Sequence, residues 1–467
     1  MPSQAASSSL PAHLRLGLSL PGIRQQLEVL PADAVRQSND CIPRDASGLP
    51  KFPPNQQLNG YINQHFISCS STDSRSLCER LQEQHSPHVG EASIFVSWPL
   101  STAMATLVDA LSVFLRQHEL PEDTTFFWVC DYVIRQGATT LRADLDRLGD
   151  CVEAIGHTCL LLEPWHAPEP LKRAYCIKEV YHTQASNARF DMVMSTEQLH
   201  SFEQALVAEF DSIASAVSAV DVRQAECRNA KDKERILGEL EAGVGFGRCN
   251  EGVIRMLRGT LGSAGHAALS RMQPDERGTS ALLPNLAELL RVNGRIDEAE
   301  PLLREAFEAR TSRLGEKHAL SLSATSQLGA FLYEKGQLKE GIRLCRRAHR
   351  LSRKALGPRH ETTLEALERL SDVLASEGFV DEAVELYGTL VDARRAMLGE
   401  QHPKTLEAQA GLGDAKRMAG QQREAEGLLR AVLVGRRAAH GDRHPDTLEA
   451  AHRLASLLEQ VNCADLP

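Results

Sequence analysis

Apolar and polar positions repeat every 42 residues along the C-terminal third of the chain. Each unit holds two stretches in which apolar residues recur at helical spacing, and a glycine follows each stretch. A fixed period of about 20 to 50 residues is typical of a solenoid, in which every unit packs on its neighbours. Four columns keep this step: Gly294, Gly336, Gly378 and Gly420; Gly315, Gly357, Gly399 and Gly441; His318, His360, His402 and His444; and Leu322, Leu364, Leu406 and Leu448.

The glycine columns mark the ends of the predicted helices, because glycine adopts a positive φ at little cost. The repeating histidines are predicted to serve in turns and packing. Equivalent residues of neighbouring units lie at least ~10 Å apart, whereas one zinc ion needs all its donors at ~2 Å. The array is predicted at 280–460 as four helix pairs and a capping helix: 280–292 with 296–313, 319–334 with 338–355, 361–376 with 380–397, 403–418 with 422–439, and 445–460.

Between residues 61 and 225 the pattern changes to short apolar runs that alternate with amphipathic stretches. Such an alternation predicts a parallel sheet with helices on both faces. Right-handed crossovers then give a doubly wound, flavodoxin-like layer. A ligand of such a sheet binds beyond the carboxyl ends of the strands, where this sequence has Ser97, Asp131 and Glu163. The predicted strands are 93–97, 125–130, 158–162 and 189–194.

Two segments lie outside these domains. Residues 1–60 contain many prolines and few periodic apolar positions, so they are predicted to be disordered. An organellar transit peptide is the alternative for their Ser- and Ala-rich beginning. Residues 226–279 are predicted to be a helical connector, whose part at 262–278 is a flexible linker or a decayed first repeat. The glycines of 243–247 follow no strand, so they predict a bend between helices rather than a nucleotide-binding loop.

The composition excludes several classes of protein. The net charge is −10 and no long basic stripe appears, so nucleic acid is not expected as a partner. No stretch approaches the ~18 consecutive apolar residues that a membrane-spanning helix needs. The 11 cysteines form no C-x-x-C pair, and no spacing of His and Cys suggests zinc. We therefore expect reduced thiols, no bound metal and a cytoplasmic location.

Three stretches of the α/β domain carry a family resemblance: SIFVSWPLSTAMATLVDAL, FFWVCDYVIRQG and IGHTCLLLEPWHAPEPLKRAYCIKEVY. Residues 92–183 resemble a divergent Toll/interleukin-1 receptor (TIR)-like domain, and 218–262 is similar to the helical tail that follows it. In TIR domains that cleave NAD, a glutamate of the YCIKE helix is catalytic, which implies this role for Glu179. Its carboxylate could stabilise an oxocarbenium-like ribose as nicotinamide leaves. Ser97 and Asp131 are then the candidate nucleotide-binding residues.

The chain also departs from this family. The turn Ser97-Trp98-Pro99-Leu100 and the loop 132–137 replace more polar segments at the place where a nucleotide would bind. A simpler interpretation of Glu179 is that of a solvated helix residue beside Lys178. The sequence leaves both interpretations open.

The repeats carry a second resemblance. LLPNLAELLRVNGRIDEAEPLLREAFEARTSRLGEKH and its successors resemble the tetratricopeptide repeats of kinesin light chains. The resemblance implies a right-handed superhelix whose concave face, lined by the first helix of each unit, accepts a peptide. Kinesin light chains hold the peptide backbone there with asparagines, and the matching column in this chain reads Asn285, Gln327, Arg369 and Gly411. With the column three residues further on, the predicted peptide-binding residues are Asn285, Glu288, Gln327, Arg369, Asp372 and Asp414.

Together these resemblances imply a protein–protein interaction scaffold. Its repeat groove binds a protein or peptide ligand, and its TIR-like domain signals or assembles by self-association. One alternative is an NAD-cleaving enzyme that uses Glu179, takes NAD as its substrate and needs no resident cofactor. A second alternative is a kinesin-light-chain-like cargo adaptor, which the lack of heptads in residues 1–90 disfavours.

Overall fold

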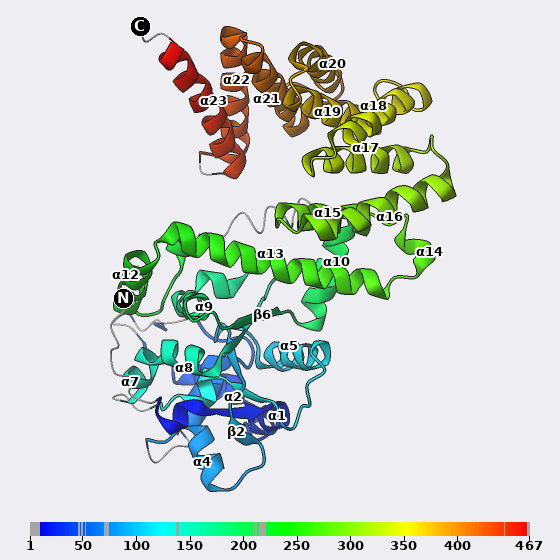
Figure 1. Ribbon diagram of the computed structural model, residues 1–467. Helices are drawn as coiled ribbons and strands as arrows, with labels where there is room; N and C mark the ends of the chain where they lie inside the picture. The colour runs from blue at the N-terminus through cyan, green and yellow to red at the C-terminus, as the bar shows by residue number, and fades with distance from the viewer. Residues whose placement is uncertain are drawn as a thin grey trace, which may run out of the picture. The chain divides into compact units, whose positions relative to one another are not determined.

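A computed structural model gives the fold, and it describes residues 10–44, 47, 50, 51, 53–69, 74–136, 140–208, 210, 213, 221–442 and 444–464. The chain forms two compact units, Met1–Ala264 and Gly265–Pro467 (Figure 1). The division falls inside the long helix α13 (Phe246–Arg271). None of the described helices combines the length and the apolar character needed to cross a membrane.

A six-stranded sheet of order β2-β1-β4-β3-β5-β6 forms the centre of the first unit. β3 lies between β4 and β5, with Phe95 opposite both Trp128 and Thr158. β3 and most of β5 are buried, as expected for strands that helices cover on both faces. Four parallel strands match those predicted from the apolar runs: β3 (Ile94–Ser97), β4 (Phe126–Trp128), β5 (His157–Leu161) and β6 (Arg189–Val193).

Two antiparallel strands extend the sheet beyond its parallel part. β1 (Leu16–Ser19) pairs with β4 on one side and with β2 (Val89–Glu91) on the other. The prediction that residues 1–60 are disordered is therefore wrong for this stretch. Leu14 and Leu18 are fully buried, and Trp128 donates a hydrogen bond from Nε1 to the carbonyl oxygen of Leu14 at 3.0 Å.

The partners of β1 are distant in the sequence, which is why no local pattern revealed this strand. Leu14 and Trp128 are 114 residues apart, and their contact alone shows that the N-terminal segment belongs to the core. After β1 the chain forms α1 (Leu20–Glu28) and α2 (Ala34–Asp40). Residues 1–9, the beginning of the segment for which a transit peptide was the alternative, lie outside the described residues.

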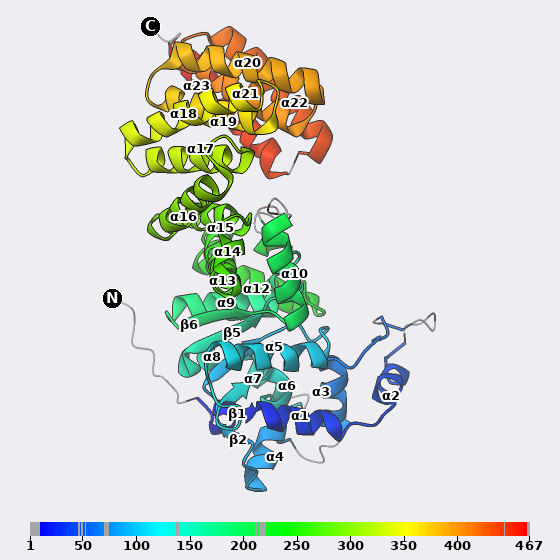
Figure 2. The same cartoon turned by 90° about the vertical axis from the view of Figure 1, so that its right-hand side faces the viewer.

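Helices connect the parallel strands and pack against the sheet. α5 packs with α1 and α10, whereas α8 and α9 pack on each other and against β3 and β5 (Figure 2). The helix after β6 is described as far as Ala208, and residues 209, 211, 212 and 214–220 lie outside the described residues. The remaining helices of this part are α3 (Gly60–Cys69), α4 (Leu77–Glu83), α5 (Met104–Gln117), α6 (Cys130–Val133), α7 (Thr140–Asp146), α8 (Leu148–Ile155), α9 (Ala174–Ala185) and α10 (Thr196–Ala208), with short 3-10 turns η1 (Ala12–Arg15), η2 (Glu169–Lys172) and η3 (Val222–Gln224).

The connector is helical where one alternative expected a flexible linker. α12 (Ala230–Gly243) ends at the predicted glycine bend, where Gly245 has a φ of +78°. α13 then continues to Arg271 without a break, so the flexible linker is wrong for residues 262–271. Leu261 and Leu269 are buried, and this burial favours the helix in spite of the glycines nearby. A short helix, α14 (Pro274–Arg277), follows.

The second unit contains the predicted array of paired helices. α17 begins and ends at the predicted residues, 319 and 334. The first helices α17, α19, α21 and α23 pack directly on one another. The pairs are α15 (Leu282–Val292) with α16 (Ile296–Leu314), α17 (Ala319–Glu334) with α18 (Leu338–Ala355), α19 (Glu361–Ser376) with α20 (Val380–Leu398), and α21 (Pro403–Met418) with α22 (Gln422–His440), and α23 (Pro445–Ala464) closes the stack.

The glycine columns lie at the carboxyl ends of these helices, and the histidine column lies at the start of first helices. All glycines of the two columns have a positive φ, between 73° and 94°. Each column histidine accepts a hydrogen bond at Nδ1 from the backbone N–H two residues further on, at 3.2 to 3.3 Å. The histidines therefore act as N-caps, which satisfy an N–H that the first helical turn leaves without a partner. The predicted turn role of these residues is confirmed.

Candidate functional site

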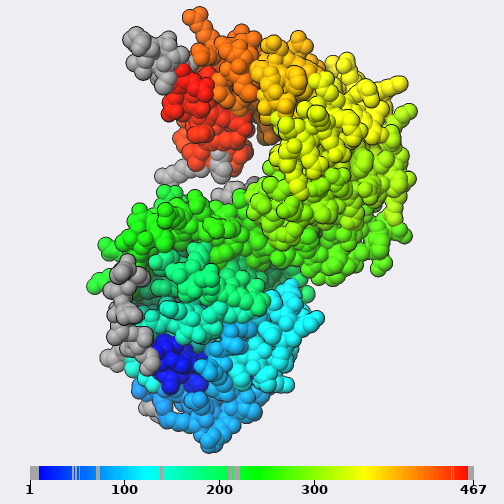
Figure 3. Space-filling view, in the orientation of Figure 1, coloured from blue at the N-terminus to red at the C-terminus, as the bar shows by residue number. Residues whose placement is uncertain are grey.

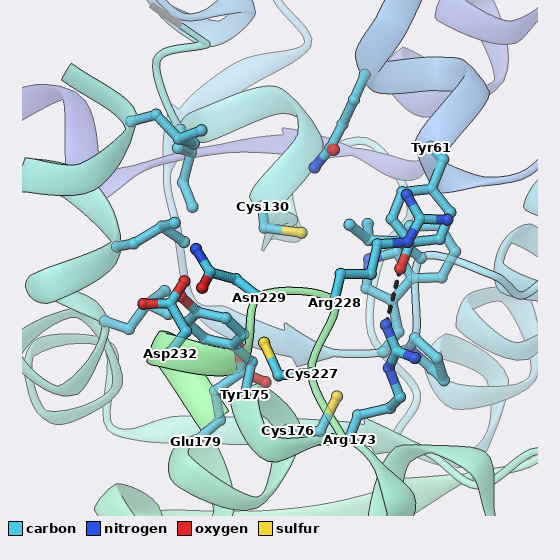
Figure 4. Close-up of a pocket in the computed structure, with 18 of the residues that line it drawn as sticks. Tyr61, Cys130, Arg173, Tyr175, Cys176, Glu179, Cys227, Arg228, Asn229 and Asp232 are labelled. Carbon is cyan, nitrogen blue, oxygen red and sulfur yellow. Dashed lines mark hydrogen bonds between the residues drawn. The ribbon is translucent and has the colours of Figure 1, made fainter. Parts of the chain in front are cut away.

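A cavity of about 340 Å³ lies at the carboxyl ends of β3 and β4, beside α9, in the first unit (Figure 4). The chain passes from β3 to β4 on one side of β3, and then returns to β5 on the other side. Ligands of doubly wound sheets bind at such a switch point. The walls come from the turn after β3, from α6 and the residues behind it, from the start of α9, and from residues 226–232 at the start of α12.

Glu179 of α9 lines this cavity and is 8% exposed. Ser97, the last residue of β3, donates a hydrogen bond from Oγ to Glu179 Oε2 at 2.5 Å. Ser97 itself is fully buried and does not line the cavity. Burial raises the pKa of Glu179 to about 8, although the hydrogen bond from Ser97 and the charge of Lys178 act in the opposite direction. Glu179 is therefore not a solvated helix residue, and at neutral pH its carboxyl is mostly protonated.

The other two predicted strand-end residues, Asp131 and Glu163, do not line the cavity either. Asp131 is fully buried and accepts hydrogen bonds from Asn63 Nδ2 at 3.1 Å and from Gln64 Nε2 at 3.2 Å. Burial raises the pKa of Asp131 to about 7. Glu163 accepts a hydrogen bond from Ser195 Oγ at 3.0 Å. Of the predicted nucleotide-binding pair, the structure thus brings Ser97 to Glu179 and places Asp131 against α3.

Two arginines gather around Tyr61 of α3 at the opposite end of the cavity (Figure 4). Arg173 donates a hydrogen bond from a terminal guanidinium nitrogen to the Tyr61 hydroxyl at 2.8 Å. The guanidinium carbon of Arg228 lies 3.3 Å from the centre of the Tyr61 ring, where the ring quadrupole attracts a cation. Burial lowers the pKa of Arg228, and the nearby charge of Arg173 lowers it further. This end of the cavity is suited to an anionic group.

Sequence reasoning missed most of the cavity. Tyr175 and Cys176 line it and belong to the YCIKE motif, so the motif contained more of the site than Glu179. Arg228 lies in the segment predicted as a connector, and Tyr61 follows the segment predicted as disordered. No spacing links these two residues to α9, so no signal in the sequence could have joined them.

The predicted peptide-binding residues lie in two columns on the first helices of the array. Two of the acidic members are paired within the array. Glu288 accepts from Arg291 at 2.7 Å, and Asp414 accepts from Arg453 at 2.6 Å. Arg453 of α23 continues the asparagine column one unit beyond the predicted residues, so the capping helix also contributes to this surface.

Asp372 and Gly411 meet the same aromatic side chain. The hydroxyl of Tyr387, from α20, donates a hydrogen bond to Asp372 Oδ1. A Cβ added at Gly411 would lie 2.4 Å from the Tyr387 ring. Gly411 therefore replaces the expected asparagine because Tyr387 occupies the space that a larger side chain would need.

The remaining three column residues, Asn285, Gln327 and Arg369, are half-buried. Gln327 keeps one buried oxygen, Oε1, that has no hydrogen-bond partner among the described residues. Arg369 is in no ion pair within the part of the chain that the structure describes, although it lies one helical turn before Asp372 on α19. The Gln327 oxygen and the Arg369 guanidinium therefore remain for a ligand to engage.

Comparison with protein families identifies the array. One tetratricopeptide repeat model matches residues 279–320, and another matches residues 320–378 and 363–438. Residues 279–438 are tetratricopeptide repeats. Such repeats build extended concave binding surfaces, so this tetratricopeptide array supports a protein–protein interaction scaffold. No curated protein matches the chain.

Several solved structures resemble the chain. The TPR-like repeats of a Podosopora anserina protein described as a kinesin light chain are 27% identical, cover 41% of this chain and 90% of their own, and align with a TM-score of 0.36. BtubC (BKLC) from P. vanneervenii is 17% identical over 52% of this chain and 92% of its own, with a TM-score of 0.33. The assignment rests on the family models, because these TM-scores are low.

Proposed function

We propose that the protein is a scaffold that binds a partner peptide along the first helices of its tetratricopeptide array. The packing of the helices carries this proposal. α17, α19, α21 and α23 contact one another, whereas each second helix packs mainly on first helices. A stack of helix pairs is narrower on the side where its helices touch, so the first helices line a concave face.

The chemistry of α19 suits a peptide backbone. Arg369 offers donors, and Asp372 offers an acceptor, because Asp372 is exposed and only its Oδ1 accepts a hydrogen bond from a described residue. A peptide presents one N–H donor and one C=O acceptor at nearly every residue. We therefore assign the peptide contacts to Asn285, Glu288, Gln327, Arg369, Asp372 and Asp414.

Peptides selected from a random library on the full-length protein test this assignment. Arg369→Glu should weaken the binding of the selected peptides at least tenfold, which corresponds to about 1.4 kcal/mol of binding free energy. The matched control is Arg430→Glu, which makes the same change on the second helix α22 and should leave binding unchanged. Equal binding by wild type and Arg369→Glu would contradict the groove. Capture of kinesin heavy chain from a lysate, lost in Arg369→Glu, would instead favour the cargo adaptor.

We also propose that the first unit is a TIR-like signalling or assembly domain. Its parallel strands lie in the order β4-β3-β5-β6 across the sheet, so the first two strands of the chain exchange places and the next two follow in sequence. This is the flavodoxin-like order. β1 and β2 add to this layer at the β4 edge. Light scattering of the full-length protein tests the assembly role. A mass that rises with concentration above 51.3 kDa supports self-association, and a constant monomer mass contradicts it.

A second candidate function is the cleavage of NAD. The observation that favours it is the position of Glu179, the residue that the TIR resemblance implies as catalytic, in a cavity at the switch point of the sheet. An ionised Glu179 would stabilise the oxocarbenium-like ribose as nicotinamide leaves. Arg173 and Arg228 would hold the phosphates. Because burial raises the pKa of Glu179 to about 8, such activity should increase as the pH rises through that value.

Chromatographic detection of free nicotinamide tests this second function. The full-length protein is incubated with NAD over a range of pH, together with Glu179→Gln and the control Glu153→Gln on the exposed face of α8. Turnover by the wild type and the control, but not by Glu179→Gln, supports the enzyme. Absence of turnover at every pH excludes it.

A further inference from the structure

α18 carries seven basic residues on one side. At about 100° per residue they fall within an arc of about 120° around the helix. Leu344, Cys345 and Ala348 occupy the opposite side and are buried, so the basic side faces away from the core. We call these residues the basic ridge: Lys339, Arg343, Arg346, Arg347, Arg350, Arg353 and Lys354.

The basic ridge is largely free of internal partners. Lys339, Arg350, Arg353 and Lys354 are exposed and form no ion pair with any residue in the described ranges. Exposed cations without partners keep their full charge available to a ligand. The other three lie near glutamates: Arg343 with Glu340 at 3.8 Å, Arg346 with Glu382 at 2.8 Å and Arg347 with Glu316 at 2.8 Å.

The repeat architecture does not require these charges. Each of the second helices before and after α18 in the stack has three acidic residues and one basic residue at the seven equivalent positions, which lie 42 residues away. The net charge of the whole chain is −10, so the ridge is a local reversal of sign. Lys339, Arg343 and Arg350 correspond to Asp381, Glu385 and Asp392 on α20, and Lys339, Arg347 and Arg350 correspond to Asp297, Glu305 and Glu308 on α16.

We propose that the basic ridge docks a short acidic segment of a partner protein. Its place on a second helix puts it on the outer side of the array (Figure 3), separate from the groove of the first helices. Arginine binds carboxylates with two parallel hydrogen bonds, and five of the seven ridge residues are arginines. The helix rises about 22 Å from Lys339 to Lys354, which matches about seven residues of an extended chain.

The surroundings of the ridge favour a short peptide over other anions. Insertion into a lipid surface needs large apolar side chains beside the basic ones, and stacking of nucleic-acid bases needs aromatic ones. α18 has no Phe, Tyr or Trp, and Leu338 is its one exposed large apolar side chain, so the helix provides neither an apolar anchor set nor a stacking surface. A longer polyanion would also run onto the acidic positions of α16 and α20. The sequence analysis found no basic stripe because apolar residues of the buried side interrupt the ridge along the chain.

The test uses a labelled peptide of alternating Asp and Glu, about ten residues long, and its binding to the full-length protein by fluorescence anisotropy. The ridge variant is Arg350→Glu/Arg353→Glu/Lys354→Glu, which changes three side chains that form no ion pair with any described residue. The control is Arg423→Glu/Arg430→Glu/Arg437→Glu on α22, which makes the same change in charge at ridge columns two units later. Circular dichroism checks that both variants remain folded.

We expect the ridge variant to bind the acidic peptide at least tenfold more weakly than the wild type, and the control to stay within twofold. Binding should weaken as salt is raised, because exposed charges are screened over about 8 Å at physiological ionic strength. Lack of saturable binding by the wild type, or an equal loss in the control, overturns the proposal. Tighter binding of duplex DNA or phosphatidylserine vesicles, lost in the ridge variant, overturns it in favour of those partners. Loss of binding in the groove variant Arg369→Glu, with the ridge variant unaffected, also overturns it.

Discussion

Replacing Glu179 with glutamine should change how the stability of the first unit depends on pH. Burial raises the pKa of Glu179 in the folded protein to about 8, from an ordinary value of 4.5. Between these two values the folded protein holds a proton that the unfolded chain has released. The stabilisation is therefore fully present below pH 4.5 and is lost as the pH rises through 8.

The size of the effect follows from the same two values. Each pH unit over which only the folded protein holds the proton corresponds to about 1.4 kcal/mol. Because the carboxyl is already half ionised at pH 8, the wild type should lose about 2 kcal/mol of stability between pH 6 and pH 8 through it. Glutamine has the shape of the protonated acid and does not titrate. Its amide can still hydrogen-bond to Ser97, so this position should contribute no pH dependence in the variant.

Urea unfolding followed by tryptophan fluorescence measures this effect in the first unit. The chain has three tryptophans, Trp98, Trp128 and Trp165, and all of them lie in this unit. Their fluorescence therefore reports on the sheet and not on the repeats. Free energies of unfolding at about pH 6 and about pH 8 give the pH dependence for wild type, Glu179→Gln and the exposed control Glu153→Gln.

The wild type and the control should lose stability in parallel, and Glu179→Gln should lose about 2 kcal/mol less. A smaller loss should remain in the variant, because burial also raises the pKa of Asp131, to about 7. If wild type and Glu179→Gln have the same pH dependence, Glu179 does not titrate as its burial requires. The predicted increase of NAD cleavage with pH would then lose its physical basis.

Three further predictions concern the array, and thermal unfolding followed by circular dichroism checks each of them. Arg394→Leu should destabilise the array by about 3 kcal/mol. The reason is that Arg394 is 1% exposed and donates hydrogen bonds to both carboxylate oxygens of Glu368 at 2.7 Å. An unchanged melting temperature would show that this ion pair is dispensable. Gly399→Ala should destabilise the array by about 1 kcal/mol because Gly399 has a φ of +92°. Gly388→Ala lies inside helix α20, where the new Cβ would meet nothing within 4 Å, so it should stabilise the array by about 1 kcal/mol. Equal effects of the two substitutions would refute the argument from φ. His402→Ala should cost about 1 kcal/mol through loss of the N-cap, and His402→Asn should restore most of it.

The helix ends of the array could be predicted because each depends on residues close in the sequence. His318 caps α17 through the N–H of Leu320, and Gly336 provides the positive φ after α17. Both requirements act within one helical turn. A 42-residue period then fixed every later unit once the first was recognised.

The first unit shows where such reasoning stops. Glu179 could be found because its motif is local, yet its burial depends on Ser97, which is 82 residues away. The contact between Arg173 and Tyr61 spans 112 residues. These contacts arise when the sheet brings distant segments together, and no periodicity in the chain encodes them. A cavity wall supplied by residues 226–232 was invisible for the same reason.

The sequence of the array contains two kinds of position, those that repeat in every unit and those that vary between units. Glycines and capping histidines recur in every unit because every unit presents the same backbone groups to be satisfied. Column residues on the first helices differ because each meets a different neighbour, as Gly411 meets Tyr387. The basic ridge of α18 fits neither case, since the stacking of the units does not need it and four of its seven side chains form no ion pair with a described residue. Seven like charges on one exposed side oppose folding by mutual repulsion, and we attribute them to the acidic partner segment proposed above.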